Sequence, residues 1–134
     1  MSVRILILAL ALAISGCSTK AITVANGTPV PNERIYLSSA GSGAELAITR
    51  DSGLYGSGIV VRIFLDGKKA ADFRQGEAFV LPITPGKHIL GVSPATMFGQ
   101  DAVVESEVDV KPGDVIRRRI TFNGGLQLTP TAYR

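Results

Sequence analysis

The chain has 134 residues, enough for one domain with its own hydrophobic core but not for two. Its formal net charge of +3 is too small to indicate nucleic-acid binding, and its single cysteine excludes an internal disulfide or a cysteine-based metal cluster. The 15 glycines and 7 prolines indicate many turns between short strands, so we expect an all-β protein.

The first 16 residues have the layout of a secretory signal peptide. Arg4 carries the leading positive charge, Ile5 to Ile14 are all apolar, and the small residues Ser15 and Gly16 follow. As a helix, the apolar run is roughly 15 Å long, about half of a bilayer core. We therefore predict an N-terminal signal helix that is cleaved off rather than a permanent membrane span.

Residues 14–17 resemble the lipobox of bacterial lipoproteins, in which an aliphatic residue, a small residue, and Gly or Ala precede a cysteine. The resemblance implies cleavage between Gly16 and Cys17 and a covalent link from Cys17 to membrane lipid, because two or three acyl chains anchor a protein effectively permanently. The alternative is an unmodified thiol beside an ordinary cleavage site. Ser18 stands where Asp usually signals inner-membrane retention, so the resemblance implies the outer membrane, facing the periplasm.

Three segments are therefore expected: the signal peptide (1–16), a lipidated tether (17–20) and a β-sandwich domain (21–134). Residues 21–24 already have the character of a strand, which would hold the domain close to the membrane. We expect a small antiparallel sandwich of about seven or eight strands, Ig-like or transthyretin-like.

Alternating apolar residues predict a strand over 34–38. The following stretch, 39–58, is rich in glycine and is expected to form loose loops with one short strand over 46–49. It lacks the glycine spacing of a phosphate-binding loop, so we interpret it as flexible connection. Use of these loops as a small-ligand site stays open as an alternative.

Asp66-Gly67 predicts a type I′ turn, which makes residues 59–65 and 68–73 a hairpin. Pro85-Gly86 suits the centre of a type II turn. Two further strands are expected before and after it, over 78–83 and 88–93.

These turn motifs carry a second resemblance, which spans roughly residues 34–122. The run Phe64-Leu65-Asp66-Gly67-Lys68-Lys69, then Gly76-Glu77, Leu81 and Pro85-Gly86-Lys87-His88 resembles the DUF2846 family of bacterial lipoproteins and, more distantly, PEGA-type β-modules. The resemblance implies a small β-sandwich at a membrane and supplies no mechanism.

His88 is the only histidine and follows a turn, so we expect it to be a hydrogen-bonded structural residue rather than a metal ligand or a catalytic base. The loop over 94–100 carries Met97 and Phe98 at its tip. We expect this tip to fold onto the end of the sandwich, with contact to a membrane or partner as the alternative.

Residues 103–110 alternate between apolar and acidic side chains, and 115–122 follow after a turn. Treated as a hairpin, they place Asp109 opposite Arg117 and Glu107 opposite Arg119. The same register turns Arg118 toward the core. A last short strand is expected over 126–129.

The three consecutive arginines 117–119, here the Arg triplet, also suggest a functional alternative. In this alternative Arg117 and Arg119 contact an anionic surface such as lipid phosphate. No catalytic motif occurs in the sequence, so we expect no enzymatic activity, no cofactor, no metal and no nucleic-acid partner. The function predicted is a non-enzymatic cell-envelope lipoprotein that presents loops or an edge strand to an envelope protein. An inhibitor, exclusion or immunity lipoprotein is the alternative.

Overall fold

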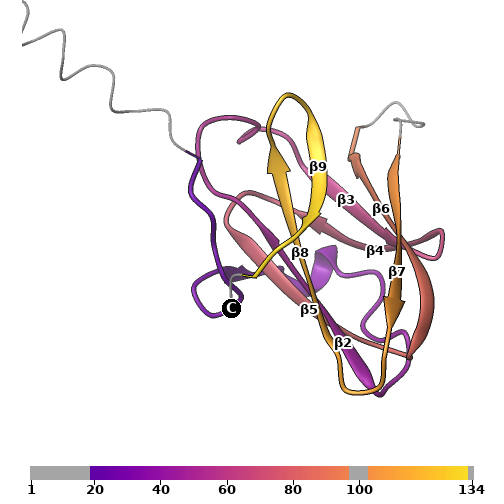
Figure 1. Ribbon diagram of the computed structural model, residues 1–134. Helices are drawn as coiled ribbons and strands as arrows, with labels where there is room; N and C mark the ends of the chain where they lie inside the picture. The colour runs from indigo at the N-terminus through magenta and orange to yellow at the C-terminus, as the bar shows by residue number, and fades with distance from the viewer. Residues whose placement is uncertain (1–18, 97–102, 133–134) are drawn as a thin grey trace, which may run out of the picture.

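The structure is a computed structural model that describes residues 19–96 and 103–132. The described chain forms nine β-strands and a short 3₁₀ helix, η2 (Asn32–Arg34), arranged as two facing sheets (Figure 1). The predicted all-β sandwich is thus confirmed, with slightly more strands than expected. No helix in the described ranges is long and apolar enough to cross a membrane. The predicted signal helix and most of the loop over 94–100 lie outside the described residues.

The first sheet has five strands in the spatial order β1, β5, β2, β8 and β9. Their bounds are β1 Thr28–Pro29, β2 Ala44–Arg50, β5 Glu77–Ile83, β8 Val115–Phe122 and β9 Leu126–Pro130. Two neighbouring pairs, β1 with β5 and β2 with β8, run parallel, and the other pairs are antiparallel. The sheet is therefore mixed rather than purely antiparallel.

Strand β2 is the centre of this sheet, and all but one of its seven residues are buried. The strand predicted over 46–49 is confirmed but is longer than expected, and the prediction that the residues beside it form loose loops is wrong for residues 44, 45 and 50. A strand covered on both faces needs no alternation of polar and apolar residues, so the periodicity of its sequence is weak.

The second sheet has four strands in the order β4, β3, β6 and β7. Their bounds are β3 Val61–Leu65, β4 Lys68–Phe73, β6 Gly86–Pro94 and β7 Val104–Val110. The β3–β4 hairpin is confirmed: Asp66 and Gly67 have φ values of 51° and 75°, as a type I′ turn requires.

The core lies between the two sheets, where alternate side chains of each strand meet. Many of these side chains are completely buried: Leu46, Ile48, Val61, Ile63, Phe73, Leu81, Ile83, Leu90, Val92 and Ile120. At about 1.5 to 3 kcal/mol per buried large aliphatic or aromatic side chain, this layer is the main source of stability in a domain without a disulfide.

The predicted hairpin of β7 with β8 is wrong, because these strands belong to different sheets. The turn between them exists, with Asp114 N–H donating to Lys111 O at 3.1 Å. However, Gly113 N–H donates to Gly43 O at 2.7 Å and Glu45 N–H donates to Asp114 O at 2.9 Å. These bonds attach the turn to the start of β2, so β8 continues beside β2 instead of folding back on β7.

Two further strand predictions are wrong. Residues 34–38 contribute only the last residue of η2 and one isolated bridge, from Ile35 to Ala71. Residues 21–24 enter a turn in which Asn26 Oδ1 accepts the Thr23 N–H at 2.7 Å. Side-chain hydrogen bonds of Thr and Asn compete with strand pairing in such short segments.

Candidate functional site

The described chain begins at one end of the sandwich and is fastened there. Lys20 N–H donates to Ser52 O at 2.7 Å, and Ser52 N–H donates to Lys20 O at 2.9 Å. Cys17 and Gly16, the predicted lipidation and cleavage residues, lie outside the described residues. The backbone is thus attached to the domain three residues after Cys17. We call this end, which also carries the loop over 51–60 and the β8–β9 turn, the anchor end (Figure 1).

The loop over 51–60, here the anchor loop, is fixed in position by contacts with the buried Arg50. The Arg50 guanidinium donates to Gly56 O at 2.7 Å and lies 5.5 Å from the centroid of the Phe122 ring. Gly56 has a φ of 73°, and a Cβ on it would lie 2.7 Å from Cδ2 of Phe122. Only glycine satisfies both constraints, so the loop has a defined position over Phe122.

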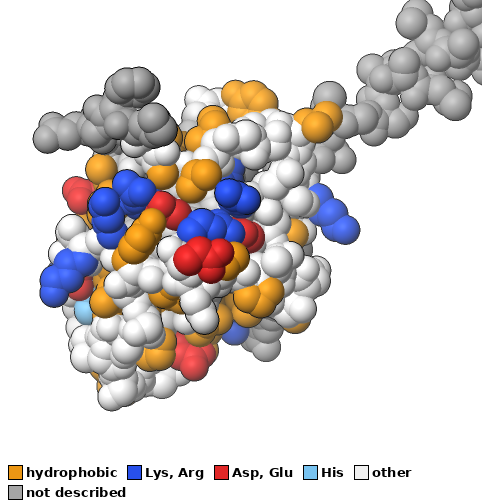
Figure 2. All heavy atoms as spheres, turned by 180° about the vertical axis from the view of Figure 1, so that it is seen from behind, with side chains coloured by type: hydrophobic (Ala, Val, Ile, Leu, Met, Phe, Trp, Pro, Cys, Tyr) orange, Lys and Arg blue, Asp and Glu red, His pale blue; other side chains and the backbone are white. Residues whose placement is uncertain are grey.

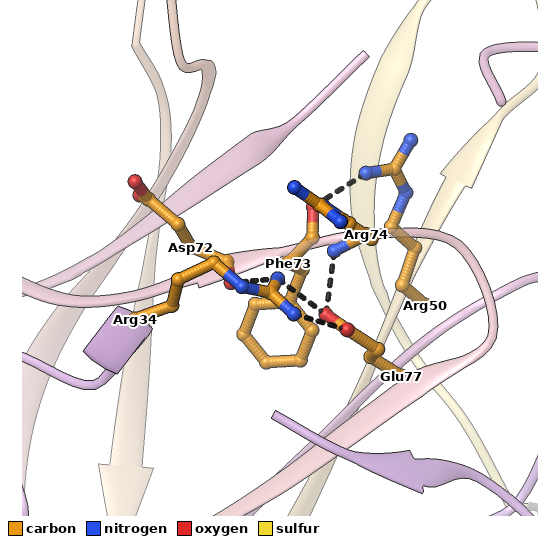
Figure 3. A network of polar contacts seen from close by, with 6 residues as sticks. All are labelled: Arg34, Arg50, Asp72, Phe73, Arg74 and Glu77. Carbon is orange, nitrogen blue, oxygen red and sulfur yellow. Dashed lines mark hydrogen bonds and ion pairs between the residues drawn. The ribbon is translucent and has the colours of Figure 1, made fainter. Parts of the chain in front are cut away.

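Arg50 also joins the two sheets, because its Nη1 donates to Phe73 O on β4 at 2.6 Å (Figure 3). Its side chain is among the largest fully buried ones, and this burial lowers the pKa of the guanidinium. Two carbonyl oxygens and an aromatic face compensate the buried charge. The sequence reading missed this role, since no local pattern distinguishes Arg50 from a solvated arginine.

The tip of the anchor loop exposes two large apolar side chains. Leu54 is 73% exposed and Tyr55 is 66% exposed, although the Tyr55 ring still contacts Phe122 edge-on at 6.3 Å between centroids. A shallow hollow of about 440 Å³ lies between this loop, Thr19 and the β8–β9 turn. The sequence signal that could have identified the site is the apolar pair itself, flanked by Gly53 and Gly56.

A second cluster surrounds Glu77 at the start of β5 (Figure 3). Its carboxylate accepts both terminal nitrogens of Arg34, one of them at 2.8 Å, and the Arg74 N–H at 2.6 Å. Burial opposes ionisation of this carboxyl, but the bonds from Arg34 and Arg74 outweigh it and lower the pKa of Glu77. Arg34 Nη1 also donates to Asp72 O at 3.0 Å, so the cluster fastens η2 to the end of β4.

The Asp72 carboxylate lies on the outer face of the second sheet, where both of its oxygens accept hydrogen bonds. It accepts Nε and Nη2 of Arg62 at 2.7 and 2.8 Å, and the Tyr36 hydroxyl at 2.9 Å. The hydrogen bond to Asp72 raises the pKa of Tyr36. Figure 2 shows basic and acidic side chains side by side across this face, as paired charges rather than a field of one sign.

The Arg triplet is divided between three environments. Arg119 binds Asp51 through Nε and Nη2, both at 2.6 Å, so its predicted pairing with Glu107 is wrong. The predicted pairing of Arg117 with Asp109 is wrong as well, because Arg117 lies beside Ala47 of β2. Arg118 lies beside the buried Ile48 of β2, on the core-facing side of the sheet as predicted, and burial lowers its pKa.

His88 is the hydrogen-bonded structural residue that the sequence predicts. Its Nδ1 lies 2.7 Å from Asp66 Oδ2, its Nε2 lies 2.8 Å from Thr84 O, and 8% of the residue is exposed. The hydrogen bond to Asp66 raises the pKa of His88. Within the described ranges no three His, Cys, Asp or Glu residues are grouped so that they could hold a metal ion.

The glycine-rich stretch does not form one loop. Strand β2 carries Gly41 and Gly43 to the end of the sandwich opposite the anchor end, roughly 20 Å from Gly53 and Gly56. A hollow of about 340 Å³ lies at that far end, beside Gly43 and Gly113. The two glycine groups therefore cannot line one common ligand site.

A third hollow, of about 390 Å³, lies along the β1–β5 edge. Val30, Phe79 and Val80 are among its lining residues, together with Val24 from the segment that precedes β1.

No family model, no curated protein and no solved structure matches this chain.

Proposed function

We propose that the protein is a non-enzymatic lipoprotein of the bacterial cell envelope, anchored through acyl chains on Cys17. The observation that carries the proposal is the sequence Ile14-Ser15-Gly16-Cys17, at the end of an apolar run that is too short to span a bilayer. Ser18, in place of an aspartate, favours the outer membrane, with the domain facing the periplasm. The resemblance of the turn motifs to DUF2846 lipoproteins agrees with this placement.

The position of the anchor end supports the proposal. Two backbone hydrogen bonds between Lys20 and Ser52 leave only Ser18 and Thr19 between the attachment and Cys17. An acylated Cys17 would hold this end at the membrane and direct the opposite end away from it. That far end comprises the turns over 41–43, 84–86 and 111–114, which are then the surface presented to an envelope protein.

The non-enzymatic part of the proposal is supported by how the charged side chains are used. Glu77, Asp72 and Asp51 each bind an arginine, and the two hydrogen bonds of His88 fasten a turn. Each of these pairs joins separate segments of the fold. A catalytic acid or base needs a hydrogen-bonding site left for substrate, and these groups use theirs within the protein.

The anchoring is tested by mass spectrometry of the mature N-terminus purified from membranes. We expect Cys17 to carry diacylglycerol through its sulfur, and residues 1–16 to be absent. The matched control is Cys17→Ala, which we expect to lack lipid. A mature chain with a free Cys17 thiol would overturn the proposal.

The partner is tested in intact cells with a photo-crosslinking residue placed at Lys111, in the exposed far-end turn. A constitutive crosslink to one envelope protein supports an assembly role. A crosslink that forms only during attack by a foreign enzyme or phage supports the inhibitor or immunity alternative. The same residue placed at Ser57, in the anchor loop, is the control for position.

A further inference from the structure

Exposed apolar side chains are concentrated at the anchor end. Half of the exposed large hydrophobic residues in the described chain lie in the anchor loop (Leu54, Tyr55 and Ile59) or where β7 begins at the same end of the sandwich (Val103 and Val104). Hydrophobic side chains are visible at this end in Figure 2, near the point where the described chain begins. Such a concentration indicates a surface that is covered in use.

The covering surface is indicated by the length of chain that leads to the anchor. Cys17 is two residues from Thr19, and two extended residues reach roughly 7 Å. Thr19 itself lines the hollow beside Leu54 and Tyr55, and Lys20 is bonded to Ser52. Acyl chains on Cys17 would therefore enter the bilayer directly beside the anchor loop.

The charges at this end fit a lipid surface. Asp51, the acid at the start of the anchor loop, is paired with Arg119 through two hydrogen bonds. Lys20 is exposed and forms no ion pair with a described residue. A tyrosine with an exposed ring suits the boundary between headgroups and acyl chains, where its apolar ring and polar hydroxyl are both satisfied.

We propose that the anchor loop is a membrane-contact element, in which Leu54 and Tyr55 enter the interface of the bilayer that holds the Cys17 acyl chains. This inference rests on the proposed lipidation of Cys17. The loop is held over Phe122 by Arg50 and Gly56, so the contact orients the whole sandwich end-on to the bilayer. Arg117 lies five residues before Phe122 on β8, roughly 17 Å along the strand, and remains away from the lipid.

The test uses the lipidated mature protein, residues 17–134, in vesicles of phosphatidylethanolamine and phosphatidylglycerol. Acylation consumes the only native thiol, so a cysteine introduced by Leu54→Cys is the sole site for a fluorescent label. Leu54 is 73% exposed, which allows the label without disturbing the fold. Labels at Lys111→Cys, at the far end, and Arg117→Cys, on the outer face of β8, are the position controls.

We expect a lipid-phase quencher to reduce the fluorescence at position 54 several-fold more than at positions 111 and 117, and an aqueous quencher to show the reverse order. Adding Tyr55→Asp beside the Leu54 label should lower the lipid-phase quenching, whereas Tyr55→Phe should preserve it. These results support the contact.

Three results would overturn the contact while leaving the anchoring intact, provided that mass spectrometry finds lipid on Cys17. The first is a label at 54 quenched only from water. The second is a label at 54 shielded from both quenchers, which indicates a covering protein. The third is stronger lipid-phase quenching at 117, which indicates a side-on orientation through the Arg triplet. Failure of the proposed function is distinct, because Cys17 would then carry no lipid.

Discussion

Removing the charge of Glu77 tests whether the ion-pair clusters stabilise the fold. In Glu77→Gln one carboxylate oxygen becomes an NH₂ group, so a donor faces the Arg34 guanidinium or the Arg74 N–H. The side chains of Arg34 and Glu77 are 17% and 8% exposed, so water compensates the lost bonds only in part. Breaking a fully buried pair costs about 3 to 5 kcal/mol, and the partial exposure of Arg34 places the expected cost at about 2 to 3 kcal/mol.

The matched control is Glu107→Gln, which removes the charge from another strand-borne pair. Lys87 and Glu107 are 69% and 55% exposed, and their amine and carboxylate lie 2.9 Å apart. Water and salt screen such a solvated pair, so it contributes little to stability and this variant should unfold almost as the unmodified protein does.

Urea and thermal unfolding of the purified variants measure both costs. For a domain of this size the Glu77 variant should melt roughly 10 °C lower, with an unchanged dependence on urea concentration. A double-mutant cycle with Arg34→Gln should give a coupling energy of about 2 kcal/mol between the two positions. Equal costs for Glu77→Gln and Glu107→Gln would refute the reasoning, because burial would then not determine the strength of these pairs.

Two further perturbations follow from the contacts. Because Asp66 raises the folded-state pKa of His88 above the unfolded value, the pair stabilises the fold below about pH 6.5, and this stabilisation is lost as the pH rises through the folded pKa. The unfolding free energy should thus fall as the pH rises from below about 6.5 through the folded pKa of His88. Asp66→Asn, which suits the turn, should flatten this change, and an unaltered slope would contradict the assignment. Within the Arg triplet, Arg119→Ala leaves the buried Asp51 carboxylate without its bidentate partner and should cost about 2 to 3 kcal/mol, whereas Arg117→Ala should cost less than about 0.5 kcal/mol in the same urea titration. Similar losses for the two arginines would contradict the division of the triplet.

The well-predicted parts of the fold are those in which the decisive contacts are local. The β3–β4 hairpin follows from Asp66-Gly67, because two adjacent residues supply both positive φ values. His88 is correctly predicted as a structural residue, since the sequence contains no second histidine and only one cysteine. The type of a turn and the number of histidines and cysteines can both be read from the sequence without knowing which distant segments come together.

The errors share the opposite cause. Strand β2 was underestimated because burial on both faces removes the alternation that marks a half-buried strand. The partner of β8 was misassigned because parallel pairing with β2 joins segments about seventy residues apart, and a short turn after β7 suggested the nearer neighbour. Leu54 and Tyr55 were read as part of a loose loop, since only the folded chain shows Arg50 holding that loop beside the first described residues.

The sequence by itself determined the all-β class, the hairpin turns and the prediction of an acylated Cys17, because each depends on residues adjacent in the chain. Tertiary structure alone decided which sheet each strand joins, which carboxylate binds each arginine, and that the exposed pair Leu54 and Tyr55 lies at the end where the described chain begins. Those outcomes depend on segments brought together by burial of the core. The residues next to a strand in the sequence do not show which distant strand or side chain it will contact when the core is buried.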